Sequence, residues 1–238
     1  MGENVVDVKG VAEQYDNENL PYDLYISKGK LNNKVIYRIS KRTVDILISS
    51  IGLVILLPIF LIVVILIKLD SKGPIFFLQK RIGINGKMFK LYKFRTMKLN
   101  ADKELRRILQ NDEEARKEYE KNKKLNKDPR ITKVGNLIRK LSIDELPQLI
   151  NILKGEMSLI GPRPYLYREK KDMGNYYEKI ITVKPGLTGL WQVSGRNNTT
   201  FKARLELDER YINNISIIND IKIFFKTFII LLKKEGAK

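Results

Sequence analysis

The sequence predicts a mainly helical α+β protein with one segment buried in a membrane. Three patterns indicate this: a long uncharged apolar run from Ile46 to Ile67, an Asn-Gly turn between two aromatic-rich runs near residue 85, and a 3.6-residue apolar repeat over residues 221–232. The first is typical of a membrane helix, the second of a β-hairpin and the third of an amphipathic helix.

The composition limits the chemistry that the chain can carry. Its 238 residues include 45 Lys and Arg against 27 Asp and Glu, a formal net charge of +18, and neither cysteine nor histidine. The positive excess indicates a polyanionic partner, which leaves nucleic acid, an anionic membrane surface and a phosphorylated substrate as options. Disulfides, imidazole metal sites and the Ser-His-Asp triad are excluded, so any catalysis falls to carboxylates, Lys, Arg, Tyr or hydroxyl groups.

The apolar run begins after a polar arm, for which we take residues 1–40. The run starts too late for a signal peptide, and no small-residue cleavage site follows it. As a helix it would be about 33 Å long, just enough for a hydrocarbon core of about 30 Å. Pro58 is expected to break it, and Lys and Arg flank both of its ends. Residues 41–72 are therefore predicted to be a Pro-broken helix that dips into one leaflet and returns, with a spanning helix and a buried core helix as alternatives.

Three further elements follow from local patterns. A small β-hairpin is predicted over residues 75–94, with strands at 75–82 and 87–94. Residues 101–124 carry dense charge of both signs and are expected to form a solvated helix without chemistry. Near the end of the chain, the apolar positions of an amphipathic helix are Ile221, Phe224, Phe225, Phe228, Ile229 and Leu232. That helix is expected either to close the core or to lie in a membrane interface.

The candidate site is the stretch from Ser142 to Gln148, which is predicted to open a short helix. Pro147 lacks an N–H and suits the first turn of a helix, so Asp144 is the expected N-cap and Glu145 the first helical residue. Gly155 is expected to end that helix in the left-handed conformation.

Two adjacent carboxylates at a helix N-terminus, with Arg139 before them and Arg163 after them, indicate a site for phosphate or Mg²⁺. A carboxylate beside bound phosphate can also attack phosphorus. Simple capping by Asp144 is the alternative interpretation.

A series of short motifs runs through the chain in a fixed order. They are Lys41-Arg42-x-x-Asp45, Gly73-Pro74, Gln79-Lys80-Arg81-x-Gly83, Lys93-Phe94-Arg95-Thr96-Met97, Asp128-Pro129-Arg130, Ser142-x-Asp144-Glu145, Lys154-Gly155-Glu156-Met157-Ser158, Gly161-Pro162-Arg163-Pro164, Lys184-Pro185-Gly186, Trp191-Gln192-Val193-x-Gly195-Arg196-Asn197 and Leu207-Asp208-x-x-Tyr211. With these motifs the chain resembles the bacterial sugar transferases of the monotopic phosphoglycosyl transferase superfamily. Those enzymes start the assembly of exopolysaccharide, capsule, O-antigen or glycoprotein glycans.

The resemblance implies a monotopic protein of the bacterial inner (plasma) membrane, with a re-entrant helix, interfacial amphipathic helices and a cytoplasmic catalytic domain over residues 73–238. It implies Mg²⁺-dependent transfer of a sugar-1-phosphate from a nucleotide diphosphate sugar, usually a UDP-sugar, to polyprenyl (undecaprenyl) phosphate. Asp144 would attack the sugar-bearing phosphate, and polyprenyl phosphate would then attack the phosphosugar-aspartyl intermediate. Glu145 would either contact Mg²⁺ with Asp144 or remove a proton from the acceptor.

The same resemblance extends to arginines and partners. The expected phosphate-binding residues are Arg139, Arg163 and Arg196, and further substrate or structural contacts are Arg95 and Arg130. The expected partners are the donor, the lipid acceptor and membrane lipids, without nucleic acid, and a homodimer is left open. The alternatives are a non-catalytic membrane scaffold and a basic nucleic-acid-binding membrane protein, and the identity of the sugar is not given by the sequence.

Overall fold

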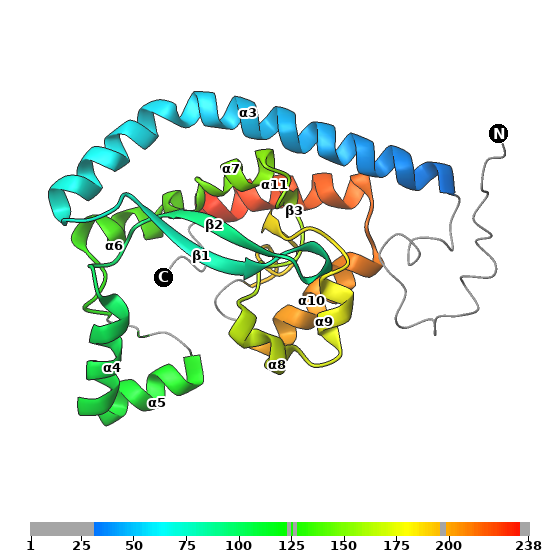
Figure 1. The fold of residues 1–238 in the computed structure, drawn as a ribbon. Helices are drawn as coiled ribbons and strands as arrows, with labels where there is room; N and C mark the ends of the chain where they lie inside the picture. Colours follow the sequence, from blue (N-terminus) through cyan, green and yellow to red (C-terminus); the bar gives the residue numbers. More distant parts are fainter. Residues whose placement is uncertain (1–30, 123–124, 126–127, 196–198, 234–238) are drawn as a thin grey trace, which may run out of the picture.

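The computed structural model describes residues 31–122, 125, 128–195 and 199–233 of the chain. A single long helix, α3, lies across one side of a compact set of shorter helices and two small sheets (Figure 1). The mainly helical α+β class is therefore confirmed.

Helix α3 runs from Leu31 to Asp70 without interruption. Pro58 lies inside it, so the predicted break is wrong: the helix continues through the proline and follows a curved path (Figure 1). Proline removes one backbone donor and crowds the preceding turn, and a long helix can relieve this by bending while its other hydrogen bonds persist.

Most of the apolar surface of α3 is exposed. Only 11% of its most apolar stretch is buried, and in the described part of the chain this is the one helix long and apolar enough to cross a membrane. Two of its side chains, Val63 and Ile67, pack on Phe94 and Ile138 of the domain below. Re-entry into a single leaflet stays a prediction.

The first half of α3 is fastened to the domain by charged residues, Arg42 and Asp45 among them. The two terminal nitrogens of Arg42 donate to the carbonyl oxygens of Ile152 and Leu153 at 2.6 and 2.8 Å, at the end of helix α7 (Gln148–Leu153). The carboxylate of Asp45 accepts from the backbone N–H of Leu159 at 2.9 Å, on strand β3 (Ser158–Ile160). The apolar helix and the domain are thus one packed unit.

The hairpin is confirmed. Strands β1 (Phe76–Ile82) and β2 (Met88–Phe94) are antiparallel, and the intervening turn η2 (Ile84–Gly86) uses positive φ at Asn85 and Gly86. A second small sheet pairs β3 in parallel with β4 (Gly186–Thr188).

The charged segment after the hairpin forms two helices, α4 (Ala101–Asn111) and α5 (Glu113–Asn122), which project from the domain (Figure 1). The prediction of one helix is wrong because Asp112 adopts an extended conformation and its carboxylate accepts from the N–H of Ala115. An aspartate that caps the second helix in this way ends the first.

The rest of the domain surrounds the core. Its helices and turns are α6 (Lys133–Lys140), η3 (Ile143–Glu145), η4 (Tyr167–Glu169), α8 (Lys170–Met173), α9 (Tyr176–Ile180), α10 (Phe201–Asn213) and α11 (Ile217–Lys233). Fully buried large side chains include Leu91, Ile152, Met157, Tyr165 and Tyr211.

Helix α11 covers the core with a different side from the predicted one. Ile223 is buried, and Phe224 and Ile230 pack against the core. The other predicted positions are exposed, namely Ile221, Phe225, Phe228, Ile229 and Leu232. Of the two expected roles of this stripe, closing the core is therefore wrong except at Phe224, and lying in a membrane interface stays a prediction. The helix is apolar around most of its circumference, so the sequence pattern did not determine which side packs inward.

Candidate active site

The two central carboxylates lie in one tight turn. Ser142 adopts a left-handed conformation with φ of 57°, and the 3₁₀ turn η3 follows at once. Helix α7 begins only at Gln148, so the predicted N-cap role of Asp144 is wrong. The left-handed serine turns the chain sharply after α6, which places Asp144 and Glu145 side by side in the turn before the helix. Gly155 has φ of +78° just beyond α7, as predicted.

Turn η3 packs against α6 and β2, and each of these elements adds a cation. From β2, the Lys93 ammonium lies 2.5 Å from one carboxylate oxygen of Glu145. From α6, the Nε of Arg139 donates to the hydroxyl of Thr96 at 2.8 Å. Among the described residues, Asp144 forms no ion pair within 4 Å, so its carboxylate stays available.

The electrostatics of the two acids differ. Burial, followed by the negative charge of Glu145, raises the pKa of Asp144 to about 6, while Lys93 and Arg139 act against this rise. Burial alone would also raise the pKa of Glu145, but Lys93 outweighs it, with help from Arg163 and Arg81, and the pKa stays below its ordinary value. The turn therefore holds one carboxylate fixed in the charged form and a second that ionises near neutral pH.

Arg163 reaches the site from the loop after β3. Its backbone N–H donates to the buried carboxylate of Asp208 at 3.1 Å, and the hydroxyl of Tyr165 donates to the same oxygen at 2.8 Å. The loop also packs closely: a Cβ on Gly161 would lie 2.6 Å from the carbonyl oxygen of Lys184. These contacts fix the backbone from which the Arg163 side chain extends.

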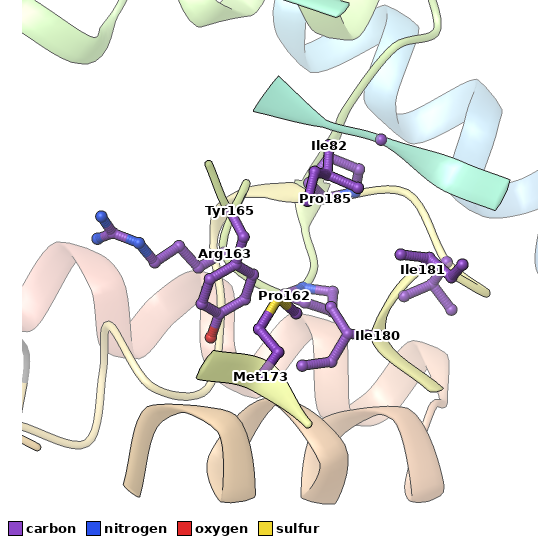
Figure 2. A pocket seen from close by; sticks show the side chains of 10 residues that line it. Ile82, Pro162, Arg163, Tyr165, Met173, Ile180, Ile181 and Pro185 are labelled. Atoms are coloured by element: carbon purple, nitrogen blue, oxygen red, sulfur yellow. The ribbon is translucent and has the colours of Figure 1, made fainter. Parts of the chain in front are cut away.

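The pocket next to this loop is mainly apolar. Figure 2 shows it lined mainly by apolar side chains, among them Ile82, Pro162, Met173 and Ile180, with the Arg163 guanidinium pointing away. Such a lining offers a phosphate few partners. The charged face lies on the other side of Arg163, toward Glu145, whose pKa the guanidinium lowers.

The remaining predicted arginines fall into two groups. Arg95 is buried and donates to the carbonyl oxygens of Ser71 and Lys72 at 2.6 and 2.9 Å, where α3 ends. Arg130 is buried in an ion pair with Asp128 at 2.6 Å. Both make structural contacts, and Arg130 also acts on Arg139 through its charge. Arg196 lies outside the described residues.

Two basic side chains that act on the carboxylates, Lys93 and Arg81, were not assigned to the site from the sequence. Lys93 stands in a quoted motif, but only the folded chain shows that it pairs with Glu145, 52 residues away. Arg81 is 7% exposed, and burial followed by the charge of Arg163 lowers its pKa to about 10. The sequence signals for these residues were the motifs Lys93-Phe94-Arg95 and Gln79-Lys80-Arg81. Neither motif indicates which of its basic side chains points toward the site.

The donor set fits Mg²⁺. Among the described residues no group of three or more acidic side chains is assembled, so a metal would rest on Asp144 and Glu145. Mg²⁺ commonly takes one or two protein carboxylates and completes its octahedron with water and substrate phosphate. Two carboxylates are therefore sufficient.

Comparison with known proteins identifies the family of the chain. The family model described as "Bacterial sugar transferase" matches residues 36–234. An uncharacterized sugar transferase of Haemophilus influenzae is 47% identical over 87% of this chain and 45% of its own length. The exopolysaccharide production protein ExoY of Sinorhizobium fredii is 44% identical over 84% of this chain and 88% of its own. The undecaprenyl-phosphate galactose phosphotransferase of Salmonella typhimurium is 46% identical over 84% of this chain and 42% of its own.

The fold and the site thus define a small helical domain that carries a carboxylate pair beside basic side chains and packs on one long, exposed apolar helix. The chain belongs to the bacterial sugar transferase family. It spans less than half the length of two of these relatives and most of the third.

Proposed function

We propose that this protein transfers a sugar-1-phosphate from a UDP-sugar to undecaprenyl phosphate. The observation that supports this most strongly is the pair of carboxylates in one turn, with Asp144 unpaired among the described residues and Glu145 held by Lys93 at 2.5 Å. The names of relatives, such as the undecaprenyl-phosphate galactose phosphotransferase, supply the reaction class.

In the first step, a carboxylate oxygen of Asp144 attacks the phosphorus that carries the sugar. The bond from this phosphorus to the bridging oxygen of the diphosphate breaks, and UMP leaves with the electron pair. The sugar phosphate is then an acyl phosphate on Asp144. The step requires an ionised nucleophile, which Asp144 supplies above its pKa of about 6.

In the second step, an oxygen of undecaprenyl phosphate attacks the same phosphorus. The acyl phosphate bond breaks, the Asp144 carboxylate is regenerated, and undecaprenyl-diphosphate-sugar leaves. The dianionic lipid phosphate can attack without prior proton removal near neutral pH, so we assign Glu145 to charge and metal contact instead of proton transfer.

The arginines compensate charge during both steps. Arg139 lowers the pKa of Asp144 and Arg163 lowers that of Glu145, so both act at the carboxylate turn. There they can hold the phosphate oxygens and stabilise the charge that spreads over them in the transition state. Asp144 and Glu145 would hold Mg²⁺, which when bound supplies further neutralisation of the diphosphate and assists departure of UMP.

A lipid acceptor requires a site at the membrane surface, and the exposed apolar surfaces suit this. We propose that the curved, unbroken α3 dips into one leaflet from the cytoplasm with its bend deepest, and that the exposed side of α11 lies in the interface. The excess of basic residues would add attraction to an anionic leaflet, about 1 kcal/mol for each Lys or Arg near the surface.

The test is UMP release from a panel of UDP-sugars with short polyprenyl phosphate, in detergent or liposomes. We expect release with at least one sugar, and a loss of at least about 10³-fold in Asp144→Asn, since the nucleophile is removed while shape is kept. Absence of release with every sugar would overturn the proposal. Salt-dependent nucleic-acid binding that survives Asp144→Ala would instead support the nucleic-acid alternative.

A further inference from the structure

Two arginines, Arg163 and Arg204, both lie against the ring of one buried tryptophan, Trp191. The Trp191 indole is 7% exposed, and the guanidinium carbons of Arg163 and Arg204 lie 5.4 and 5.2 Å from its ring centre. Its N–H is buried without a hydrogen-bond partner in the described structure. The ring thus holds two guanidinium groups near each other, because each lies within 5.4 Å of the ring centre.

The positive charge at this cluster is only partly balanced by the protein: Glu169 acts on Arg204 and Arg81 through its charge, without a close ion pair to either in the described residues. Within the described part of the chain, neither Arg163 nor Arg204 forms an ion pair with a carboxylate. Arg81 adds a third, buried guanidinium whose Nε lacks a partner. Burial, followed by the charge of Arg163, lowers the pKa of Arg204. Arg163 thus repels both Arg81 and Arg204, and like charges held this close are costly unless an anion joins them.

Thr199 holds the Arg204 guanidinium in place and uses only part of its N–H groups, so the others are available to a ligand. Its Nε and one terminal nitrogen donate to the hydroxyl and the carbonyl oxygen of Thr199, at 3.3 and 3.0 Å. These two bonds to one residue fix the plane of the guanidinium. A planar guanidinium with remaining N–H groups is well suited to phosphate oxygens.

The position of the cluster indicates which phosphate it would meet. Arg204 lies in the first turn of α10, and Tyr211 at the other end of α10 bonds to Asp220 of α11, which pairs with Lys41 of α3. Seven residues of helix separate these positions by about 10 Å. Helix α10 begins on the side of the domain away from α3 and ends toward it (Figure 1). A lipid phosphate near α3 would therefore approach from the opposite side, whereas a soluble nucleotide can reach the first turn of α10.

We propose that Arg204, together with Arg163 and the Trp191 ring that positions both, forms a subsite for the nucleotide-side phosphate of the donor, and that this subsite retains UMP after it leaves. The subsite rests on the proposed function, because it assumes a nucleotide diphosphate sugar as donor. Arg163 would be shared: it faces Glu145 on one side and the subsite on the other. Lipid phosphate has no contact with Arg204 in this arrangement.

The test measures UMP binding by titration calorimetry with the full-length Asp144→Asn protein, so that turnover plays no part. Adding Arg204→Gln should weaken UMP binding about 10- to 100-fold, the range for losing one charge-assisted hydrogen bond, and Arg204→Lys should fall between. The matched control is Arg210→Gln, which removes an exposed arginine from the same helix and should change UMP affinity less than about twofold.

A second measurement separates the two phosphates. With Asp144 intact, Arg204→Gln should raise the KM for the UDP-sugar and leave the KM for undecaprenyl phosphate unchanged. A raised KM for the lipid with unchanged UMP affinity, or UMP affinity unchanged in Arg204→Gln of normal thermal stability, would overturn the subsite. These results differ from failure of the proposed function, in which UMP is not released from any UDP-sugar.

Discussion

The arginines of this protein divide into two regions that look alike in sequence and differ in their partners. Around the end of α3 and the turn after residue 128, Arg95 and Arg130 are buried and their donors are used by protein oxygens. Around Trp191, Arg163 and Arg204 lie against the indole ring and, among the described residues, have no carboxylate partner, although Arg204 also donates to Thr199. Arginines whose donors are saturated by protein oxygens (the paired region) hold the fold, whereas those without a carboxylate partner (the unpaired region) mark where a substrate anion is expected.

The largest effect is expected in the paired region. Arg130→Ala would leave Asp128, whose side chain is 5% exposed, as a buried charge without its partner. Breaking such a pair typically costs about 3–5 kcal/mol of folding free energy. Thermal unfolding should show a clear drop in Tm. The double variant Asp128→Asn/Arg130→Gln, which leaves no net charge, should lose less, and an unchanged Tm in Arg130→Ala would contradict the assignment.

The unpaired region should respond in activity and not in stability. Arg163→Gln removes a donor aimed at the phosphate oxygens, so kcat/KM for the UDP-sugar is expected to fall about 10²- to 10³-fold. The backbone bond from residue 163 to Asp208 is kept, and Tm should stay close to that of the natural protein. Arg168→Gln, an exposed neighbour, serves as control. A loss of Tm comparable to that of Arg130→Ala would erase the distinction between the two regions.

The carboxylate turn should show a matching pH dependence. Because Asp144 attacks in its ionised form and its pKa is raised to about 6, kcat/KM should fall as the pH is lowered through about 6. Lys93 lowers that pKa, so Lys93→Met should move the acid limb to higher pH. If the acid limb of the kcat/KM profile stays at the same pH in Lys93→Met, a group other than Asp144 controls this limb.

The smallest effect is expected at an exposed pair. Lys117 and Glu113 lie 2.9 Å apart on α5 with side chains 73% and 66% exposed. Glu113→Gln should change the free energy of unfolding by less than about 0.5 kcal/mol and leave UMP release unchanged. A larger change would show that distance alone, without burial, is enough to make an ion pair structural here.

Part of this picture could be predicted from the sequence. The hairpin followed from Asn85-Gly86 between aromatic runs, and the end of α7 from Gly155, because both depend on local backbone preferences. Asp144 and Glu145 were found as a pair, but the N-cap role was wrong, since the left-handed Ser142 that forms the turn has no strong sequence signal.

The rest depends on contacts between distant parts of the chain. Motifs placed Arg95, Arg130 and Arg163 together as candidates, yet their different partners appear only in the fold. Arg204 was not selected at all, because its importance comes from contact with Trp191, which lies in a loop before the helix that carries Arg204. The inward side of α11 was also missed, since an apolar helix can pack with several of its sides.

The most direct test of the proposed mechanism is to look for the covalent intermediate. The protein would be mixed with its UDP-sugar without lipid acceptor, quenched with acid, and analysed by intact and peptide mass spectrometry. The account predicts a mass increase of one sugar phosphate on the peptide containing Asp144, absent in Asp144→Asn. Transfer of sugar phosphate to undecaprenyl phosphate at the natural rate by Asp144→Asn would contradict it.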